Sequence, residues 1–490
     1  MLSLAVAMQV RSGAYTSDFA ADPDEAPHVV SGLLIRDVAA GHLFENPLRY
    51  AENYYVHFPK VAIGHWPPMF HAVEGVWMLV FGRTKTSLFI LLALLASVLV
   101  GAIVYSVLPD CGMLASVAAA AIFASTQFVQ HSVSWVMPDL FLSLLGFGAM
   151  LAWGSYLASE NRRVAMAAVV LVLASIATNG RGLAVGLAVL LAGSIGARTP
   201  VARLRFRWAT GVALILILVP GIVGKPFRVT PGIVLANFLH FGISLARQIT
   251  WPAALLSALG AVVVWRTKDP RSVSILSLLA ATWIFHSLLN FPFDDRYVAG
   301  ALPAAAALLA IGWHFAAKPW IAVVFSVVAC AILVWNLAHL ERKTDLGYHT
   351  LVNGPSDIAR ASHISLIAGD PMQEGSYVAE MDLADAHLRH IVLRGSKVLA
   401  SSTWAGNLYR QKFSSAGEVA NYLDQFGVTL VIVQNDGPPH VAQLRDAISS
   451  LPDKWHESPA EAIVKNARVF ERSGRVPGVP QEITFEMLFQ

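Results

Sequence analysis

Charged side chains are scarce in this chain of 490 residues. Only 14% of the residues are Asp, Glu, Lys or Arg, whereas soluble domains carry about 25%. In contrast, 56% are hydrophobic, and the mean hydropathy is +0.57. The net charge of +3 is too small to indicate a nucleic-acid partner. A chain of this composition is predicted to lie in a lipid bilayer.

Cysteine is also nearly absent. Cys111 and Cys330 are the two cysteines, and they lie far apart in or beside apolar runs. This argues against a disulfide framework and against a cysteine metal site. The N-terminal MLSLAVAMQV lacks a basic region and a clear cleavage site, so no cleavable signal peptide is predicted. Its apolar run stops at Arg11, short of the roughly 20 residues that a full crossing needs, so we expect an incomplete first span.

Long apolar runs recur as far as residue 340. Together with the incomplete first one they predict about 11 membrane spans. The runs are 86–108, 113–129, 138–158, 164–179, 182–197, 208–224, 251–265, 273–289, 297–316 and 319–339.

Lysine and arginine concentrate in four short connectors between these runs, at 160–163, 198–208, 265–271 and 316–320. Cytoplasmic loops carry the excess of basic residues, so we place all four connectors in the cytoplasm. The remaining loops then lie on the extracytoplasmic side; they are 130–139, 178–182, 225–250 and 290–297.

The segment PPMFHAVEGVWMLVFG (67–82) is apolar, but a full crossing there would turn every basic connector outward. We therefore interpret it as an interfacial or re-entrant helix on the outer side. The whole segment 14–85 is then an extracytoplasmic loop. The amphipathic segment 232–248 is placed on the same side, as a wall or a mobile flap beside a lipid groove.

Residues 341–490 carry ordinary charge, and a β-rich run at 428–434 follows a helical one at 416–427. This pattern predicts a small soluble α/β domain, also extracytoplasmic. The predicted fold is thus an α-helical polytopic membrane domain (1–340) followed by this α/β domain.

Ionisable side chains gather on the predicted outer side. Arginine binds phosphate oxygens through paired N–H groups, and a carboxylate beside a hydroxyl can act as a base worth about 10²–10⁴-fold in rate. The set therefore predicts a site for an anionic, lipid-linked substrate. It comprises Asp22, Asp24, Glu25, Lys60, His65, His71, Asp139, Arg181, Lys225, Arg228, Asp294, Asp295 and Arg296, with Asn179 and Tyr297.

A series of short motifs runs through residues 1–340 in a fixed order. They are the acidic pair Asp24-Glu25, then Gly41 and Pro47, Trp66-Pro67-Pro68-Met69, Phe81-Gly82, VMPDLFLSLLGF (136–147), TNGRG (178–182) and DDRYVAGALPAAAAL (294–308). In this order they resemble the motifs of the GT-C glycosyltransferases, in the branch that contains lipid A aminoarabinose transferase and the protein O-mannosyltransferases.

The resemblance implies a polyprenyl-phosphate sugar as donor (undecaprenyl in a bacterium), transfer with inversion, and a lipid, glycan or protein acceptor outside the plasma membrane. It implies that Asp24, first of the acidic pair with Glu25, is the base, and that Asp139 is a second active-site acid. A single base suffices because phosphate leaves with little protonation, unlike the leaving group of a glycosidase. No cofactor is expected.

The same resemblance implies that Arg181 and Arg296 bind the donor phosphate. Two departures affect this assignment. Trp66 replaces a basic residue before the double proline, with Lys60 as a possible substitute, and Asn179 replaces a lysine, with Arg181 two positions later. His65, Trp66 and Tyr297 are expected in the substrate pocket.

Other interpretations stay open. Asp22 and Asp24 could form a metal-binding pair, or the acidic run could start a helix. The histidines His28, His42, His57, His65 and His71 could bind zinc, although their spacing matches no tight ligand pattern. Asp139 could be a helix cap, Arg181 an interfacial arginine, and Arg296 a partner of Asp294 and Asp295. The aromatics Trp66, Trp135, Trp251 and Trp404 could simply be belt or core residues.

The alternative function is a lipid or glycolipid transporter or flippase, and a third is a membrane scaffold.

Overall fold

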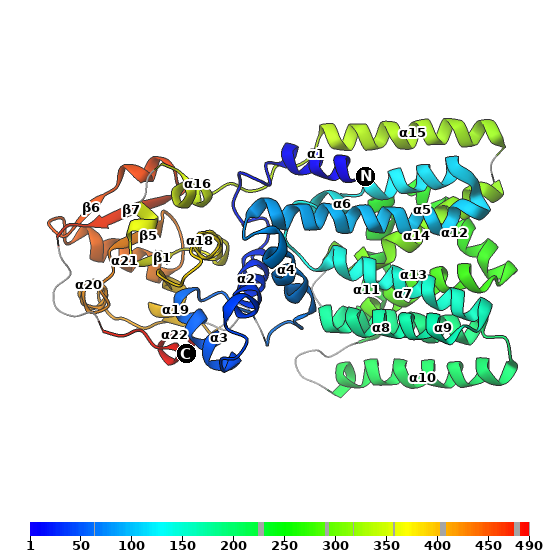
Figure 1. The fold of residues 1–490 in the computed structure, drawn as a ribbon, viewed down its shortest axis with the longest axis horizontal. Helices are drawn as coiled ribbons and strands as arrows, with labels where there is room; N and C mark the ends of the chain where they lie inside the picture. The colour runs from blue at the N-terminus through cyan, green and yellow to red at the C-terminus, as the bar shows by residue number, and fades with distance from the viewer. Residues whose placement is uncertain are drawn as a thin grey trace.

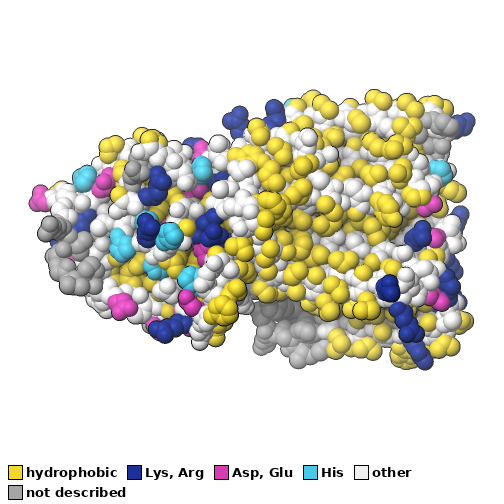
Figure 2. Space-filling model, viewed as in Figure 1, with side chains coloured by type: hydrophobic (Ala, Val, Ile, Leu, Met, Phe, Trp, Pro, Cys, Tyr) yellow, Lys and Arg dark blue, Asp and Glu magenta, His cyan; other side chains and the backbone are white. Residues whose placement is uncertain are grey.

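The computed structural model describes residues 1–62, 64–223, 230–289, 294–316, 318–355, 358–401, 408–474 and 481–489. The molecule is elongated, with a bundle of long helices at one end and a β-sheet flanked by helices at the other (Figure 1). Hydrophobic side chains cover the flank of the bundle, while charged side chains are more frequent around the sheet and at the far end of the bundle (Figure 2). This distribution suits a bundle surrounded by lipid.

The bundle helices coincide with the apolar runs to within several residues at most positions. They are α1 (Leu2–Ser12), α5 (Lys85–Ala124), α6 (Gln127–Ser132), α7 (Asp139–Ser159), α8 (Arg162–Thr178), η1 (Gly180–Gly182), α9 (Leu183–Gly196), α10 (Pro200–Val223), α11 (Pro231–Ile249), α12 (Trp251–Thr267), α13 (Pro270–Ser287), η2 (Asp295–Ala301), α14 (Leu302–Ala316) and α15 (Pro319–Ala338). Helix α5 covers two of the predicted runs. A kink at Gly112, where φ is 76°, separates them.

Two boundaries differ from the sequence prediction. The connector 198–208 is mostly helical, because α10 begins at Pro200, a residue suited to the first turn of a helix. The run 113–129 ends at Ala124, because Thr126 starts the short helix α6 by accepting a hydrogen bond from the backbone N–H of Val129.

By length and composition, four helical segments in the described part of the chain could cross a membrane: α5, α7, α11 and Asp295–Ala316. Shorter apolar helices accompany them at Met69–Phe81, Gly180–Gly196, Trp251–Thr267 and Val323–Ala338. The count of about 11 spans stays a prediction.

Helix α11 packs across the sheet-facing end of the bundle. Near its start, Asn237 donates to the carbonyl of Leu289, just after α13. Near its end, Gln248 accepts from the backbone N–H of Phe128 in α6. Asn237 and Gln248 are thus held at the same end of the bundle, and the role of α11 as a wall beside a lipid groove stays a prediction.

Three helices of the first loop lie between bundle and sheet in Figure 1: α2 (Glu25–Gly41), α3 (Pro47–His57) and α4 (Met69–Phe81). Helices α2 and α4 cross closely. A Cβ atom on Gly75 would lie only 3.0 Å from the carbonyl oxygen of Gly32. The segment 67–82 is therefore a helix packed against another helix of the first loop, and its interfacial position stays a prediction.

The sheet has five strands in the order β2-β1-β5-β7-β6. β1, β2 and β5 are parallel, whereas β7 pairs antiparallel with β5 and β6. Its interior strands are apolar because both faces are covered. The strands are β1 (Ile364–Ala368), β2 (Ile391–Arg394), β5 (Leu430–Gln434), β6 (Trp455–Glu457) and β7 (Ala467–Arg472), with a separate pair β3 (Ala400–Ser401) and β4 (Arg410–Gln411).

Helices surround the sheet: α16 (Tyr348–Asn353), α17 (Ile358–Ala361), α18 (Pro371–Ala384), α19 (Gly395–Val398), α20 (Ala416–Gln425), α21 (Pro439–Ser449), η3 (Pro459–Ala462) and α22 (Phe485–Phe489). The strand predicted at 428–434 and the helix predicted at 416–427 are confirmed as β5 and α20.

Buried ion pairs join the sheet region to the first loop. Arg83 lies between Asp37 and Asp382, with N–O distances of 2.7 Å to each. Lys85 lies 2.5 Å from Glu380 of α18. Removing one partner of such a buried pair is costly, so these contacts fix the sheet against the loop.

Candidate functional site

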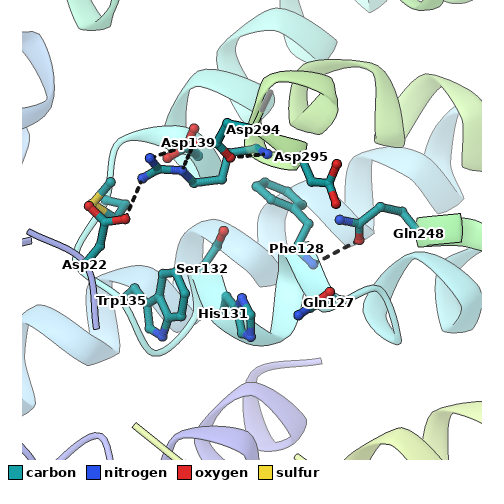
Figure 3. A pocket seen from close by; sticks show the side chains of 12 residues that line it. Asp22, Gln127, Phe128, His131, Ser132, Trp135, Asp139, Gln248, Asp294 and Asp295 are labelled. Atoms are coloured by element: carbon teal, nitrogen blue, oxygen red, sulfur yellow. Dashed lines mark hydrogen bonds and ion pairs between the residues drawn. The ribbon is translucent and has the colours of Figure 1, made fainter. Parts of the chain in front are cut away.

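A cavity of about 280 Å³ opens at the sheet-facing end of the bundle (Figure 3). Its walls come from the first loop, from α6 and the turn after it, from the start of α7, from α11 and from η2. The lining residues are Asp22, Gln127, Phe128, His131, Ser132, Trp135, Met137, Asp139, Gln248, Asp294, Asp295 and Arg296.

Arg296 is the cation of this cavity wall. Its Nη2 lies 2.8 Å from Asp294 Oδ2, and its Nη1 lies 3.2 Å from Asp22 Oδ2. Asp294 also caps η2, because its side chain accepts from the backbone N–H of Arg296. The first loop and η2, distant in sequence, therefore meet at one guanidinium.

Asp139 and Arg181 form the second ion pair of the site. Arg181 Nη1 lies 2.6 Å from Asp139 Oδ1, and Asp139 is 2% exposed. Asn179 orients Arg181 by accepting from its backbone N–H and from its Nε. The guanidinium also lies 5.5 Å from the ring centre of Tyr297, a cation–π distance. Asp139, Arg181, Arg296 and Tyr297 thus lie near one another.

Asp24 lies at the edge of this cluster and does not line the cavity. It is the residue immediately before α2, and it is half-buried. Burial raises its pKa above the ordinary value, and the charge of Asp22 raises it further. The charges of Arg296, Lys60 and His65 oppose this rise, which places these three groups within electrostatic range of Asp24.

Glu25 points elsewhere although it is adjacent in sequence. Its carboxylate is fully buried, lies 2.5 Å from Lys343 Nζ, and accepts from the backbone N–H groups of Ala21 and Val136. Because Val136 lies three residues before Asp139, this carboxylate ties the first loop to the start of α7. The structure thus does not bring Glu25 to the cavity lining.

Lys60, His65 and Trp66 also lie outside the cavity lining. Lys60 is buried and donates to the carbonyl of Pro371 at the start of α18. Burial lowers its pKa to about 7. Trp66 stacks on His28 at 4.5 Å, and exposed His65 packs edge-on against Trp66 at 4.8 Å. Lys225, Arg228 and Trp404 lie outside the described residues.

Sequence reasoning missed one wall of the cavity. Gln127, His131 and Trp135 follow one another at intervals of four, and Gln248 approaches from α11. Trp135, for which a belt or core position is one interpretation, lines the cavity. The helical spacing of these three polar or amphipathic residues in QFVQHSVSW was the available signal.

Within the described ranges, no group of three or more His, Cys, Asp or Glu side chains could hold a metal ion. Asp22 instead interacts with Arg296, whose charge would compete with a cation at the Asp22–Asp24 pair. Independence of metal stays a prediction.

No protein-family model matches the chain, and no curated protein does. Among solved structures, the chain is similar to ArnT from Cupriavidus metallidurans in the apo state, with a TM-score of 0.60, 13% identity and coverage of 97% of both chains. It is also similar to the same protein bound to undecaprenyl phosphate, with a TM-score of 0.54, 13% identity and coverage of 97% of this chain and 98% of that chain. At this identity the likeness establishes the fold alone. The chain is a helical membrane protein with the GT-C fold of the glycosyltransferases.

Proposed function

We propose that this protein transfers a sugar from a polyprenyl phosphate to a hydroxyl of an acceptor, with inversion and with Asp24 as the base. The observation that carries the proposal is one cavity lined by Arg296 and by acids from three distant segments, with Arg181 paired to one of these acids, Asp139. The GT-C fold, seen with undecaprenyl phosphate in one ArnT structure, supports a lipid-phosphate donor.

The reaction requires one displacement. The acceptor hydroxyl gives its proton to the Asp24 carboxylate, and its oxygen forms a bond to the anomeric carbon. The bond between that carbon and the phosphate oxygen breaks, and its electron pair leaves with the phosphate. Arg296 is placed to bind the resulting charge, because a guanidinium matches phosphate oxygens in a two-point contact. Arg181 contributes a second positive charge to the site through its ion pair with Asp139.

The orientation of the helices supports an extracytoplasmic site. Helices α7, α9, α12 and α14 each begin near the cavity end and are followed by the four basic connectors. The connectors then lie at the opposite end of the bundle, which the distribution of basic residues assigns to the cytoplasm. The cavity, the loop 14–85 and the domain 341–490 would face outward from a bacterial inner membrane.

The substitution Asp24→Asn tests the proposal. Purified protein in vesicles is given a radiolabelled polyprenyl-phosphate sugar and membrane lipids, and release of polyprenyl phosphate is measured with thermal unfolding as a check on folding. We expect transfer to fall about 10²–10⁴-fold, because a carboxamide cannot accept the proton.

Asp453→Asn is the matched control, since Asp453 is an exposed aspartate near the sheet, and we expect no change in transfer. Wild-type transfer by Asp24→Asn would remove Asp24 as the base. Lipid movement across the vesicle without any sugar transfer by the wild-type protein would instead favour a flippase.

A further inference from the structure

The two walls of the cavity differ in charge. One wall, formed by the first loop, α7 and η2, carries Asp22, Asp139, Asp294, Asp295 and Arg296. The opposite wall carries Gln127, His131 and Trp135, and α11 closes one side with Gln248 (Figure 3). We call this second surface, Gln127, His131, Trp135 and Gln248, the neutral wall.

Every carboxylate of the first wall, which we call the charged wall, already has a cationic or imidazole partner. Asp22 and Asp294 share Arg296, and Asp139 pairs with Arg181. Asp295 Oδ1 lies 3.4 Å from His240 Nε2. A positively charged sugar would have to break one of these pairs to find a counter-ion. An anionic sugar would add a negative charge beside four carboxylates, which costs free energy in a partly desolvated cavity.

The neutral wall offers hydrogen-bonding groups that are not yet used. In the part of the chain that the structure describes, the Gln127 carboxamide makes no hydrogen bond. Gln248 uses only its oxygen, which accepts from the N–H of Phe128 at 3.2 Å, so its two N–H donors are available. His131 stacks on Trp135 at 4.2 Å, and its Nε2 lies 3.4 Å from Glu341 Oε2, so the two glutamines carry the available uncharged groups of this wall. Uncharged donors and acceptors of this kind suit sugar hydroxyls.

The size of the cavity limits what it can hold. A volume of about 280 Å³ lies just below the range of ligand pockets for drug-sized molecules, which is about 300–1,000 Å³. It accommodates one sugar ring next to the phosphate and not a chain of sugars.

On the basis of the proposed function, we infer that the neutral wall binds the hydroxyls of a single uncharged sugar, with Gln127 and Gln248 determining specificity. The phosphate would lie at Arg296, and the ring would lie along α6. The two glutamines act on the sugar alone and not on the lipid phosphate.

Dissociation constants for matched lipids test this inference without knowledge of the acceptor. The probes are bare polyprenyl phosphate and its glucosyl, xylosyl, glucuronosyl and glucosaminyl forms, bound to the full-length protein in nanodiscs. We expect a glucosyl or xylosyl group to tighten binding relative to the bare lipid. The glucuronosyl and glucosaminyl forms should bind at least about tenfold more weakly than the better uncharged form.

Variants then locate the contact. Gln127→Leu and Gln248→Leu should each weaken binding of the uncharged form by about 3- to 10-fold, the contribution of one neutral hydrogen bond. Binding of bare polyprenyl phosphate should stay unchanged, which also shows that each variant is folded. Gln130→Leu is the control, because Gln130 lies on the same helix outside the cavity lining and donates to the carbonyl of Ser125.

The outcomes separate the two proposals. Tighter binding of a charged form, or glutamine variants that bind every probe as the wild type does, would overturn the neutral-wall inference and leave the proposed function intact. If bare polyprenyl phosphate itself does not bind, or binds equally to Arg296→Met, the proposed function fails.

Discussion

Asp22 and Asp24 lie two positions apart but have different surroundings. Asp22 lines the cavity and interacts with Arg296, and it also accepts from the backbone N–H of Asp24. Asp24 is set back and half-buried, and burial raises its pKa above the ordinary value of 3.8. A base with a raised pKa binds a proton more readily at neutral pH, so the environment suits Asp24 for proton abstraction.

This difference predicts the pH dependence of transfer. In the proposed mechanism transfer requires ionised Asp24, so activity should be present above the pKa of Asp24 and fall as the pH drops through that pKa, at a midpoint above 3.8. In Asp22→Asn the midpoint should move to lower pH, because a negative neighbour is lost and the charge of Arg296 is less offset. A profile of kcat/KM against pH measures this; a midpoint that stays fixed or rises would contradict it.

Single residues also show where sequence reasoning stopped. The motif placed Glu25 beside Asp24 in one acidic pair. Successive side chains of a helix point about 100° apart, and Glu25 is the first residue of α2, so the two carboxylates diverge. Glu25 pairs with Lys343, which is 318 residues away in the chain. A sequence motif around residue 25 cannot predict a partner at this distance along the chain.

Among elements, α12 and α14 approach as closely as backbone allows. A Cβ atom on Gly260 would lie 1.9 Å from the carbonyl oxygen of Leu308, and one on Gly312 would lie 2.0 Å from that of Leu256. Small residues of this kind allow helices to pack tightly in a membrane, where the hydrophobic effect gives no attraction between helices.

We expect Gly260→Ala to force these two helices apart and to destabilise the protein by about 1–3 kcal/mol or more, the usual cost of overpacking. Thermal unfolding in detergent measures the effect. Gly211→Ala is the control, because a Cβ atom at Gly211 in α10 meets nothing within 4 Å. Equal midpoints for the two variants would show that α12 and α14 can separate without cost.

Elements were more predictable from sequence than residues. Long apolar runs fixed the bundle helices, because a lipid-exposed backbone must satisfy its own hydrogen bonds. The sequence did not reveal α6, because six residues after a threonine cap give too short a pattern, and it did not reveal the helical start of α10, where arginines masked the continuation. The neutral wall was missed because its helical spacing in QFVQHSVSW covers only three residues, and because Gln248 comes from a distant helix.

The molecule as a whole depends on charges buried between its two parts. The predicted division near residue 340 describes where the composition changes, yet it says nothing of how the parts meet. The structure joins them through pairs such as Lys85–Glu380 and Lys343–Glu25, with side-chain exposures of 5% or less. Each pair links a residue of the first 85 to one beyond residue 340, so the loop that carries Asp24 is tied directly to the C-terminal region.

Lys343 lies in the segment between α15 and α16 and is the sharpest test of this coupling. Lys343→Met leaves the Glu25 carboxylate buried without its cation, which is expected to cost about 3–5 kcal/mol. The double variant with Glu25→Gln removes both charges and should recover part of that loss, as seen by thermal unfolding. Lys465→Met is the matched control, because the exposed Lys465–Asp345 pair should contribute about 1 kcal/mol or less.

The Lys343→Met substitution should also slow sugar transfer. Glu25 holds the backbone of Val136 near Asp139 and follows Asp24 directly, so losing its cation should misplace both acids and lower kcat more than it raises KM. Suppose that Lys343→Met has the same unfolding midpoint and the same kcat as Lys465→Met. Then the C-terminal region does not support the site, and the acids of the cavity are held by the bundle alone.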